Sequence, residues 1–217
     1  MLNLTFGKRL DSGLRVLCLG AHSDDIEIGC GGTILRLLEE NPAAEIYWVV
    51  LGASGPRRTE AIESAKRFLE NARRHEIVVK EFRDGYFPYI GTEIKDFFEE
   101  LKRQFLPDLI LTHYRGDLHQ DHRLVSELTW NTFRNHLILE YEIVKYDGDL
   151  GTPNFFVQLT DSIARKKVRT IVDCFKSQKD RSWFTGDSFF SILRLRGIES
   201  NAPEKFAEGF YCRKIAY

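Results

Sequence analysis

A chain of 217 residues is long enough for one domain with a full-sized core, and 43% hydrophobic with 29% charged residues is an ordinary globular composition. The 31 Lys and Arg residues nearly balance the 32 Asp and Glu residues, which gives a formal net charge of -1. This balance excludes a strongly basic nucleic-acid-binding protein and a solvating acidic tail, so we expect no nucleic-acid partner.

The cysteine pattern and the apolar runs indicate a cytoplasmic protein. The four cysteines lie far apart in the sequence and form no CxxC pair, which is typical of free thiols. Residues 1–13 lack the basic segment and the apolar run of a secretory signal. The longest apolar runs are much shorter than the roughly 20 residues that a membrane-spanning helix needs, so we expect no membrane span.

Short apolar runs alternate with helix-like segments along the first part of the chain. This alternation implies right-handed crossovers and a mostly parallel sheet with helices on both faces, a three-layer, Rossmann-like α/β fold. Polar loops follow the strands, at the end of the sheet where such folds bind ligands. We predict strands at residues 15–20, 45–51, 77–82 and 108–112, a loop at 21–32, and helices at 34–40, 59–74, 92–105 and 122–135.

The pattern changes from residue 140 onward. We predict strands at residues 140–146 and 154–159, helices at 161–178 and 187–198, and an edge strand at 209–215. No internal repeat, linker or low-complexity segment interrupts the sequence. We therefore expect a single domain over residues 1–217, with a core at 14–136 and a C-terminal elaboration at 137–217.

The first polar cluster follows the first predicted strand and contains His22, Asp24, Asp25 and Glu27. The adjacent Asp24 and Asp25 point in different directions, so one carboxylate can bind a metal while the other faces a substrate. Carboxylates gathered at one strand end repel one another unless a cation or a positive helix end neutralises them. An acidic loop that caps a helix explains the same residues, so this cluster alone leaves both interpretations open.

The second polar cluster, at residues 117–122, follows the fourth predicted strand and also opens a helix. Its histidines, His119 and His122, flank Asp121, which suits a metal ligand, an acid–base imidazole and a carboxylate that fixes a tautomer. In a parallel sheet this loop and the first cluster can converge between the first and fourth strands. A His–Asp–His set suits zinc and leaves one coordination position for water, which indicates catalysis.

Glycines at residues 29–32 offer a different interpretation, because a glycine-rich segment that opens a helix can bind a phosphate. Their GxGG spacing differs from the GxGxxG of dinucleotide sites, and the acidic residues before them would repel a pyrophosphate. We therefore keep a nucleotide-binding module as the weaker alternative and assign these glycines to close packing between helix and sheet.

Together the two clusters resemble a known pair of motifs. The segments AHSDDIEIG and HQDH are similar to the AHPDDxE and HxDH signatures of the PIG-L/LmbE-like N-deacetylases, and the resemblance extends from about residue 16 to residue 210. Either motif alone is weak, whereas the pair is specific. The chain departs from the family pattern at Ser23, where Pro is usual, and this affects the stiffness of the loop more than the identity of the ligands.

The resemblance implies a metal-dependent amide hydrolase and assigns roles to residues of both motifs. His22, Asp25 and His122 would bind the metal, which would be zinc or another first-row divalent ion. Asp24 would be the general base that takes a proton from the attacking water. His119 would stabilise the oxyanion or protonate the leaving amine.

Four further residues receive roles by the same resemblance. Asp121 would tune the neighbouring histidine as part of the catalytic machinery, and Glu27 would support the loop. Arg57 lies in an RxxE segment whose arginine faces the substrate in the family, and Asp84 lies in a loop whose aspartate hydrogen-bonds sugar hydroxyls. Helix capping near Arg57 and a turn at Asp84 explain these two residues equally well.

The implied substrate is an N-acetylated sugar or glycoconjugate of the N-acetylglucosamine type, from which the enzyme would release acetate. The same metal site could instead hydrolyse another amide or a carbamoyl bond, because a family fixes chemistry better than it fixes the acceptor. The sequence leaves open whether the chain forms a homo-oligomer. Five aromatic residues are candidates for a sugar-stacking wall, although such residues more often belong to the core: Phe87, Tyr89, Trp183, Phe184 and Phe189.

Overall fold

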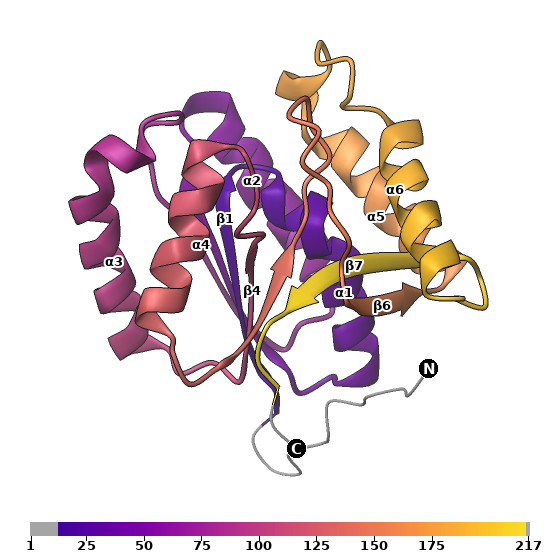
Figure 1. The fold of residues 1–217 in the computed structure, drawn as a ribbon, viewed down its shortest axis with the longest axis horizontal. Coiled ribbons are helices and arrows are strands. Elements are labelled where there is room, and N and C mark those ends of the chain that lie inside the picture. Colours follow the sequence, from indigo (N-terminus) through magenta and orange to yellow (C-terminus); the bar gives the residue numbers. More distant parts are fainter. Residues whose placement is uncertain (1–12, 216–217) are drawn as a thin grey trace.

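A computed structural model describes residues 13–215 and arranges seven strands of this range in one sheet, in the order β3-β2-β1-β4-β5-β7-β6 (Figure 1). Neighbouring strands from β3 to β5 run parallel, whereas β7 runs antiparallel to β5 and to β6. Residues 1–12, for which we predict no secretory signal, lie outside the described residues. The strands are β1 (Arg15–His22), β2 (Glu45–Gly52), β3 (Arg74–Val79), β4 (Leu109–His113), β5 (Leu137–Tyr141), β6 (Phe155–Leu159) and β7 (Phe206–Cys212).

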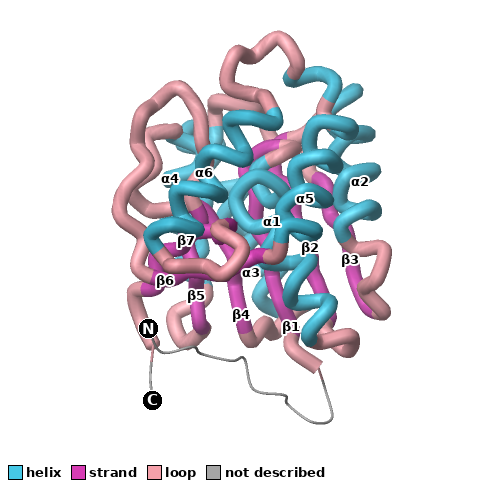
Figure 2. Tube along the Cα trace, turned by 90° about the vertical axis from the view of Figure 1, so that its right-hand side faces the viewer, coloured by secondary structure: helices cyan, strands magenta, loops and turns pink. Residues whose placement is uncertain are grey.

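Helices cover both faces of the sheet (Figures 1 and 2). One face carries α1, α2, α5 and α6, and the other carries α3 and α4, which confirms the predicted three-layer α/β fold. No helix within the described range is long and apolar enough to cross a membrane. The helices are α1 (Asp25–Glu40), α2 (Gly55–Phe68), α3 (Gly91–Gln104), α4 (Gln120–Thr132), α5 (Asp161–Cys174) and α6 (Gly186–Glu199), with short 3-10 helices η1 (Phe87–Ile90) and η2 (Lys176–Gln178).

The central strands are buried on both faces, which explains why their sequences are continuous apolar runs. In β1, Val16 and Cys18 belong to the layer with α1 and α2, whereas Leu17 and Leu19 belong to the layer with α3 and α4. Burying one such aliphatic side chain stabilises the fold by about 1.5–3 kcal/mol. The two layers hold the strand ends, and therefore the loops that follow them, in fixed positions.

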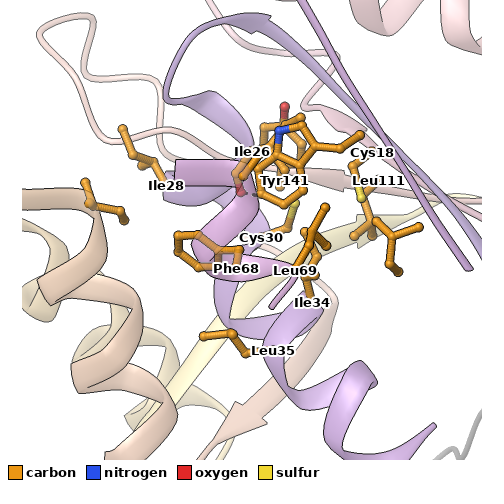
Figure 3. Packing of buried hydrophobic residues seen from close by; sticks show 14 of the residues in the cluster. Cys18, Ile26, Ile28, Cys30, Ile34, Leu35, Phe68, Leu69, Leu111 and Tyr141 are labelled. Atoms are coloured by element: carbon orange, nitrogen blue, oxygen red, sulfur yellow. Dashed lines mark hydrogen bonds between the residues drawn. The ribbon is translucent and has the colours of Figure 1, made fainter. Parts of the chain in front are cut away.

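The first helix begins earlier than predicted, and the glycine-rich segment expected to be a loop lies inside it. Tyr141 and Phe68 lie against α1 (Figure 3). A Cβ atom on Gly29 would come within 2.1 Å of Tyr141 Cδ2, and one on Gly31 within 2.6 Å of Phe68 Cε1. Glycine costs a helix about 1 kcal/mol relative to alanine. Here the close packing of two aromatic rings outweighs that cost. A prediction from local propensity therefore placed the start of α1 too late.

Three boundaries near the second crossover also differ from prediction. α2 begins before residue 59, because Pro56 occupies its first turn, where the fixed φ of proline fits a helix. α2 ends before residue 74, and β3 begins at Arg74 rather than at residue 77. Pairing with β2 sets this register, since Arg74 lies opposite Glu45. The polar, exposed start of β3 gave no strand signal in the sequence.

The C-terminal strand is not the edge strand that we predicted. β7 lies between β5 and β6, so β6 forms the edge of the sheet. β5 also ends at Tyr141, and the residues that follow form a loop rather than a strand to residue 146. Inside the sheet, Glu208 of β7 is buried and its Oε1 lies 2.5 Å from Lys167 Nζ of α5. These pairings join segments far apart in the chain, and a local pattern does not contain them.

Candidate metal centre and active site

The two polar clusters meet at the point where the strand order reverses. β1 and β4 are parallel neighbours at the centre of the sheet, with β2 beyond β1 and β5 beyond β4. The first cluster begins with His22, the last residue of β1, and leads into α1, whose N-cap is Asp24; the second leads into α4, whose N-cap is His119. Two helix N-termini and two strand ends therefore surround one site, as expected at a topological switch point.

The three predicted metal ligands form a compact triangle of donor atoms. His22 Nδ1 lies 3.1 Å from His122 Nε2 and 3.4 Å from Asp25 Oδ2, and His122 Nε2 lies 3.5 Å from Asp25 Oδ1. In a tetrahedral zinc site with bonds of about 2.0–2.1 Å, donor atoms lie about 3.3 Å apart. The three distances are close to this spacing, with Asp25 contributing Oδ2 to the distance from His22 and Oδ1 to the distance from His122. All three side chains are buried, so their interaction with a bound cation would compensate for much of the hydration that these polar groups lose on burial.

The carboxylates around this triangle favour a positive charge, as the pKa of His22 shows. Burial alone would lower the pKa of His22, but the carboxylates of Asp25, Asp121 and Asp84 outweigh it and raise the pKa well above its ordinary value. Burial, together with the nearby His113, lowers the pKa of His122 to about 3. Without a metal the two adjacent imidazoles thus differ in protonation, whereas metal binding requires both to be neutral.

A carboxylate holds the second ring nitrogen of each of these histidines. Asp121 Oδ2 lies 3.1 Å from His22 Nε2, and the backbone N–H groups of Gly85 and Phe87 donate to the same carboxylate at 2.6 and 3.1 Å. Asp121 is completely buried. Asp121 therefore lies against His22, the histidine of the other motif, and fixes the orientation of that ring. It does not lie beside a substrate.

Asp117 plays the corresponding part for His122. Its Oδ2 lies 2.9 Å from His122 Nδ1, and its Oδ1 accepts a hydrogen bond from the backbone N–H of His119 at 2.7 Å. Lys145 Nζ, from the segment after β5, lies 3.0 Å from the same Oδ2. Burial would raise the pKa of the Asp117 carboxyl, but His122, His113 and Lys145 outweigh it and hold the pKa well below its usual range. Asp117 is therefore an anion that orients His122.

Asp24 and His119 lie beside the triangle without belonging to it. Asp24 is buried, and its Oδ1 accepts a weak hydrogen bond from Ser23 Oγ at 3.4 Å. Burial and the neighbouring Asp25 carboxylate raise the pKa of Asp24 to about 6. His119 Nδ1 accepts from the backbone N–H of Asp121 at 3.2 Å, and burial, with the charge of His22, lowers the pKa of His119. A neutral His119 therefore carries its proton on Nε2, as a donor.

Arg57 and Asp84 form an ion pair at the rim of the same site. Arg57 Nη1 donates to Asp84 Oδ2 at 2.6 Å, and Asp84 Oδ1 lies 3.1 Å from His22 Nε2. Glu27, by contrast, is fully buried in α1, and the Ser64 side chain lies beside its carboxylate. Burial raises the pKa of Glu27 well above its ordinary value. The structure thus brings Arg57 and Asp84 to the site and places Glu27 inside α1, outside the cavity lining.

One histidine of the site was missed by the sequence analysis. His113 ends β4, is completely buried, and stacks on His122 with ring centroids 3.9 Å apart. Its Nε2 lies 3.2 Å from Asp25 Oδ2 and accepts from the backbone N–H of Ala21 at 3.0 Å. Its signal was a histidine at the end of an apolar strand, directly before the second cluster. Among the described residues, three sets have donor atoms close enough to one another to hold a metal, and each shares one or two members with the predicted triad: His22 with His119 and His122, Asp25 with His113 and His122, and His22 with Asp84 and Asp121.

A cavity of about 240 Å³ opens above these groups. One wall consists of residues predicted from the two motifs and the Arg57–Asp84 pair, whereas Asp121 lies behind the wall. The opposite wall comes from the C-terminal part of the chain, which sequence reasoning did not connect with the site. It consists of Ile143, Lys145, Tyr146, Asp147, Gln178, Arg181 and Trp183.

Of the five aromatic residues considered for a sugar-stacking wall, Trp183 lines this cavity. Phe87, Phe184 and Phe189 are buried in the core, and Tyr89 is 77% exposed away from the cavity lining. Tyr146, which was not considered, lines the cavity instead.

Comparison with known proteins agrees with the motifs. The family model described as GlcNAc-PI de-N-acetylase, PIG-L, matches residues 17–133. A curated relative, the uncharacterized deacetylase YaiS of Escherichia coli (strain K12), is 27% identical over 173 residues, which are 76% of this chain and 90% of the relative. Both findings bear out the resemblance to N-deacetylases.

Solved structures share the fold. The N,N'-diacetylchitobiose deacetylase from Pyrococcus horikoshii matches with a TM-score of 0.69 and 22% identity, over 94% of this chain and 86% of that chain. The 4-carboxy-2-hydroxymuconate hydratase GalB from Pseudomonas putida matches with a TM-score of 0.73 and 17% identity, over 94% of this chain and 98% of that chain. Since one neighbour is a deacetylase and the other a hydratase, the fold alone does not name the reaction.

Proposed function

The chain belongs to the PIG-L family, whose model covers residues 17–133 of its 217, and from this membership we propose that it is a metal-dependent N-deacetylase of an N-acetylated sugar or sugar conjugate. The observation that supports the proposal most is the buried triangle of His22, Asp25 and His122, whose donor atoms are 3.1–3.5 Å apart. The deacetylase relative supports the reaction class.

We assign the metal to these three side chains, and zinc is the ion that suits two imidazoles and one carboxylate. Other first-row divalent ions accept the same donors. A divalent cation supplies Lewis acidity at such a site, which makes water acidic enough to act as a nucleophile near pH 7 and polarises an amide carbonyl. Asp121 and Asp117 hold the far nitrogens of His22 and His122 and keep both rings in place.

Asp24 is the proposed general base. Its carboxylate lines the cavity next to Asp25, and within residues 13–215 it makes neither a helix-capping hydrogen bond nor an ion pair. A carboxylate with free lone pairs beside the reacting water can take its proton, a role worth about 10²–10⁴-fold in rate. The adjacent positions of Asp24 and Asp25 thus divide two tasks, proton transfer and metal binding, between neighbouring side chains.

His119 is the proposed donor to the reacting acetyl group. Its Nδ1 is occupied by the backbone N–H of Asp121, so the Nε2 proton is free for the oxygen that becomes negative when the amide is attacked. The leaving nitrogen must also gain a proton, because an amide anion is a very poor leaving group. The proton that Asp24 takes from water is available for that transfer.

The Arg57–Asp84 pair is the proposed contact for sugar hydroxyls. Both side chains line the cavity, and both remain partly exposed, so they can exchange bonds with a ligand. We further propose that residues 14–136 carry the chemistry, that residues 137–217 add the opposite wall, and that the protein acts in the cytoplasm. The free state of all four cysteines, which lie within the described residues, suits that compartment.

Product analysis tests this function. The metal-loaded protein should release acetate and a free amine from at least one member of a panel of N-acetylated sugars and glycosides. A chelator should abolish release, and zinc should restore it. If the loaded protein released ammonia or carbon dioxide from other amides or carbamoyl compounds and no acetate from the panel, the alternative hydrolase reaction would replace deacetylation.

A further inference from the structure

A lysine from the C-terminal part of the chain contacts the carboxylate that supports His122. Lys145 lies between β5 and β6, in the segment 142–154, which rises beyond the sheet in Figure 1. Its Nζ lies 3.0 Å from Asp117 Oδ2, and the same oxygen lies 2.9 Å from His122 Nδ1. The family model, which matches residues 17–133, includes Asp117 and His122 but not this lysine.

Contacts outside the two motifs fix the segment that carries Lys145. Arg196 of α6 donates to both carboxylate oxygens of Glu142, at 2.6 and 2.8 Å, and to the carbonyl oxygen of Gly151 at 3.0 Å. Arg196 and Glu142 are buried, so this ion pair is protected from competing water. The segment is therefore held at two points, one on each side of Lys145, independently of the metal site.

A second carboxylate holds the ammonium group itself. Asp149 Oδ2 lies 2.5 Å from Lys145 Nζ and accepts from the backbone N–H of Leu118 at 2.7 Å. The side chains of Lys145, Asp117 and Asp149 are only 8%, 2% and 5% exposed. Charges that are shielded from water to this degree act strongly on their neighbours. Lys145 is thus a fixed positive charge on the oxygen that His122 uses.

The two carboxylates that support the histidines of the triangle differ in this respect. Asp121, which supports His22, accepts from two backbone N–H groups of the segment after β3. Asp117, which supports His122, has an ammonium group on its Oδ2. A backbone N–H is neutral, whereas an ammonium group opposes the charge of the carboxylate. The two histidines therefore have supporting partners of unequal electrostatic strength.

Position and charge predict opposite effects for Lys145. If the lysine only held Asp117 in place, its removal would free the ring of His122 and weaken metal binding. However, other contacts hold Asp117: its Oδ1 accepts from the backbone N–H of His119 at 2.7 Å, and its own N–H donates to the carbonyl oxygen of Tyr114 at 3.1 Å. The carboxylate therefore keeps its place without Lys145, and the effect of the charge decides the outcome.

We propose that Lys145 acts on the metal centre through Asp117 and lowers its affinity for zinc. A carboxylate that attracts the Nδ1 proton of a histidine makes Nε2 a more basic ligand, and an ammonium group on the same oxygen reduces this attraction. A less basic ligand leaves the cation a stronger Lewis acid, which favours the activation of water over tight retention of the ion. The inference rests on the proposed metal centre, to which it adds a residue from the C-terminal part of the chain.

The zinc affinity of the full chain, measured by competition with a fluorescent chelator, tests this inference without a substrate. A supporting carboxylate contributes about 10- to 100-fold to affinity, and cancelling half of this effect on a logarithmic scale corresponds to about 3- to 10-fold. Lys145→Met should therefore bind zinc about 3- to 10-fold more tightly than the unmodified chain. Lys145→Gln should change the affinity in the same direction, and it covers the case in which Lys145→Met fails to fold, because its amide can still donate hydrogen bonds. Lys145→Arg keeps the charge and should keep the original affinity.

Arg181→Met is the matched control, because Arg181 is an exposed cation of the same cavity wall whose charge water screens. It should change the zinc affinity by less than about twofold. In an Asp117→Ala background, Lys145→Met should bring no gain, since its effect passes through that carboxylate. Unchanged or weaker zinc binding in the folded Lys145→Met and Lys145→Gln variants, or an equal gain in Arg181→Met, would overturn the inference and leave the metal centre and deacetylation intact. An unmodified chain that binds no zinc would overturn both the inference and the proposed function.

Discussion

Replacing Asp117 by Ala should weaken zinc binding by about 10- to 100-fold, although Asp117 is not among the proposed ligands. The carboxylate is 2% exposed, its Oδ2 lies 2.9 Å from His122 Nδ1, and it is the partner that fixes this ring. Its removal frees the imidazole to rotate and takes a negative charge from the neighbourhood of the cation. The expected loss corresponds to about 1.4–2.8 kcal/mol of binding free energy.

Competition with a fluorescent zinc chelator measures this change directly, without any substrate. Asp117→Asn should give an intermediate affinity, because the amide oxygen can still accept from His122 Nδ1 while the charge is lost. Asp147→Ala is the control, since Asp147 also faces Lys145, at 3.8 Å, but forms no hydrogen bond or ion pair with a histidine of the described chain. Wild-type zinc affinity in a folded Asp117→Ala protein would refute the reasoning that this carboxylate supports the metal site.

Three further substitutions test other parts of the account. Asp24→Asn should keep one zinc per chain and lower kcat by about 10²–10⁴-fold, because only proton transfer is lost; metal analysis and acetate release measure the two. Gly29→Ala should lower the free energy of unfolding by about 1–3 kcal/mol in urea, because its Cβ would lie 2.1 Å from Tyr141. Lys167→Met should cost about 3–5 kcal/mol in the same assay, because it leaves Glu208 as a buried charge without its cation.

Each of these changes has a control. For Asp24→Asn it is the metal content, since loss of zinc would assign the defect to binding instead of proton transfer. Gly186→Ala, in α6, meets its nearest atom at 3.6 Å and should change stability little. Lys166→Met removes an exposed pair with Glu70 and should cost less than about 0.5 kcal/mol. Equal effects at Lys166 and Lys167 would contradict the importance assigned to burial.

The parallel core could be predicted from the sequence because its signals are local. Residues 15–20 and 45–51 are apolar runs of strand length between helical segments, and such runs are typical of strands buried on both faces. The start of α1 could not be predicted in this way, since Gly29 and Gly31 are poor helix formers by themselves. Only the rings of Tyr141 and Phe68, distant in the chain, explain why they belong to a helix.

The residues of the site likewise fall into two groups, those that local sequence signals predict and those that they do not. His22 ends β1, and His122 lies in the first turn of the helix that follows β4, both inside recognisable motifs, so their convergence follows from the predicted meeting of the two loops between the first and fourth strands. His113 escaped notice because a single histidine at a strand end carries no spacing signal. Tyr146 and Trp183 reach the cavity through loops whose position depends on β7 lying between β5 and β6, a long-range pairing that no local pattern encodes.

The crystal structure of the zinc-loaded protein, with anomalous diffraction recorded at the zinc edge, tests the central claim most directly. The account predicts one ion bound by His22 Nδ1, His122 Nε2 and a carboxylate oxygen of Asp25, at about 2.0–2.2 Å from each. An ion held instead by His113, or by His22 together with Asp84 and Asp121, would contradict the proposed metal centre.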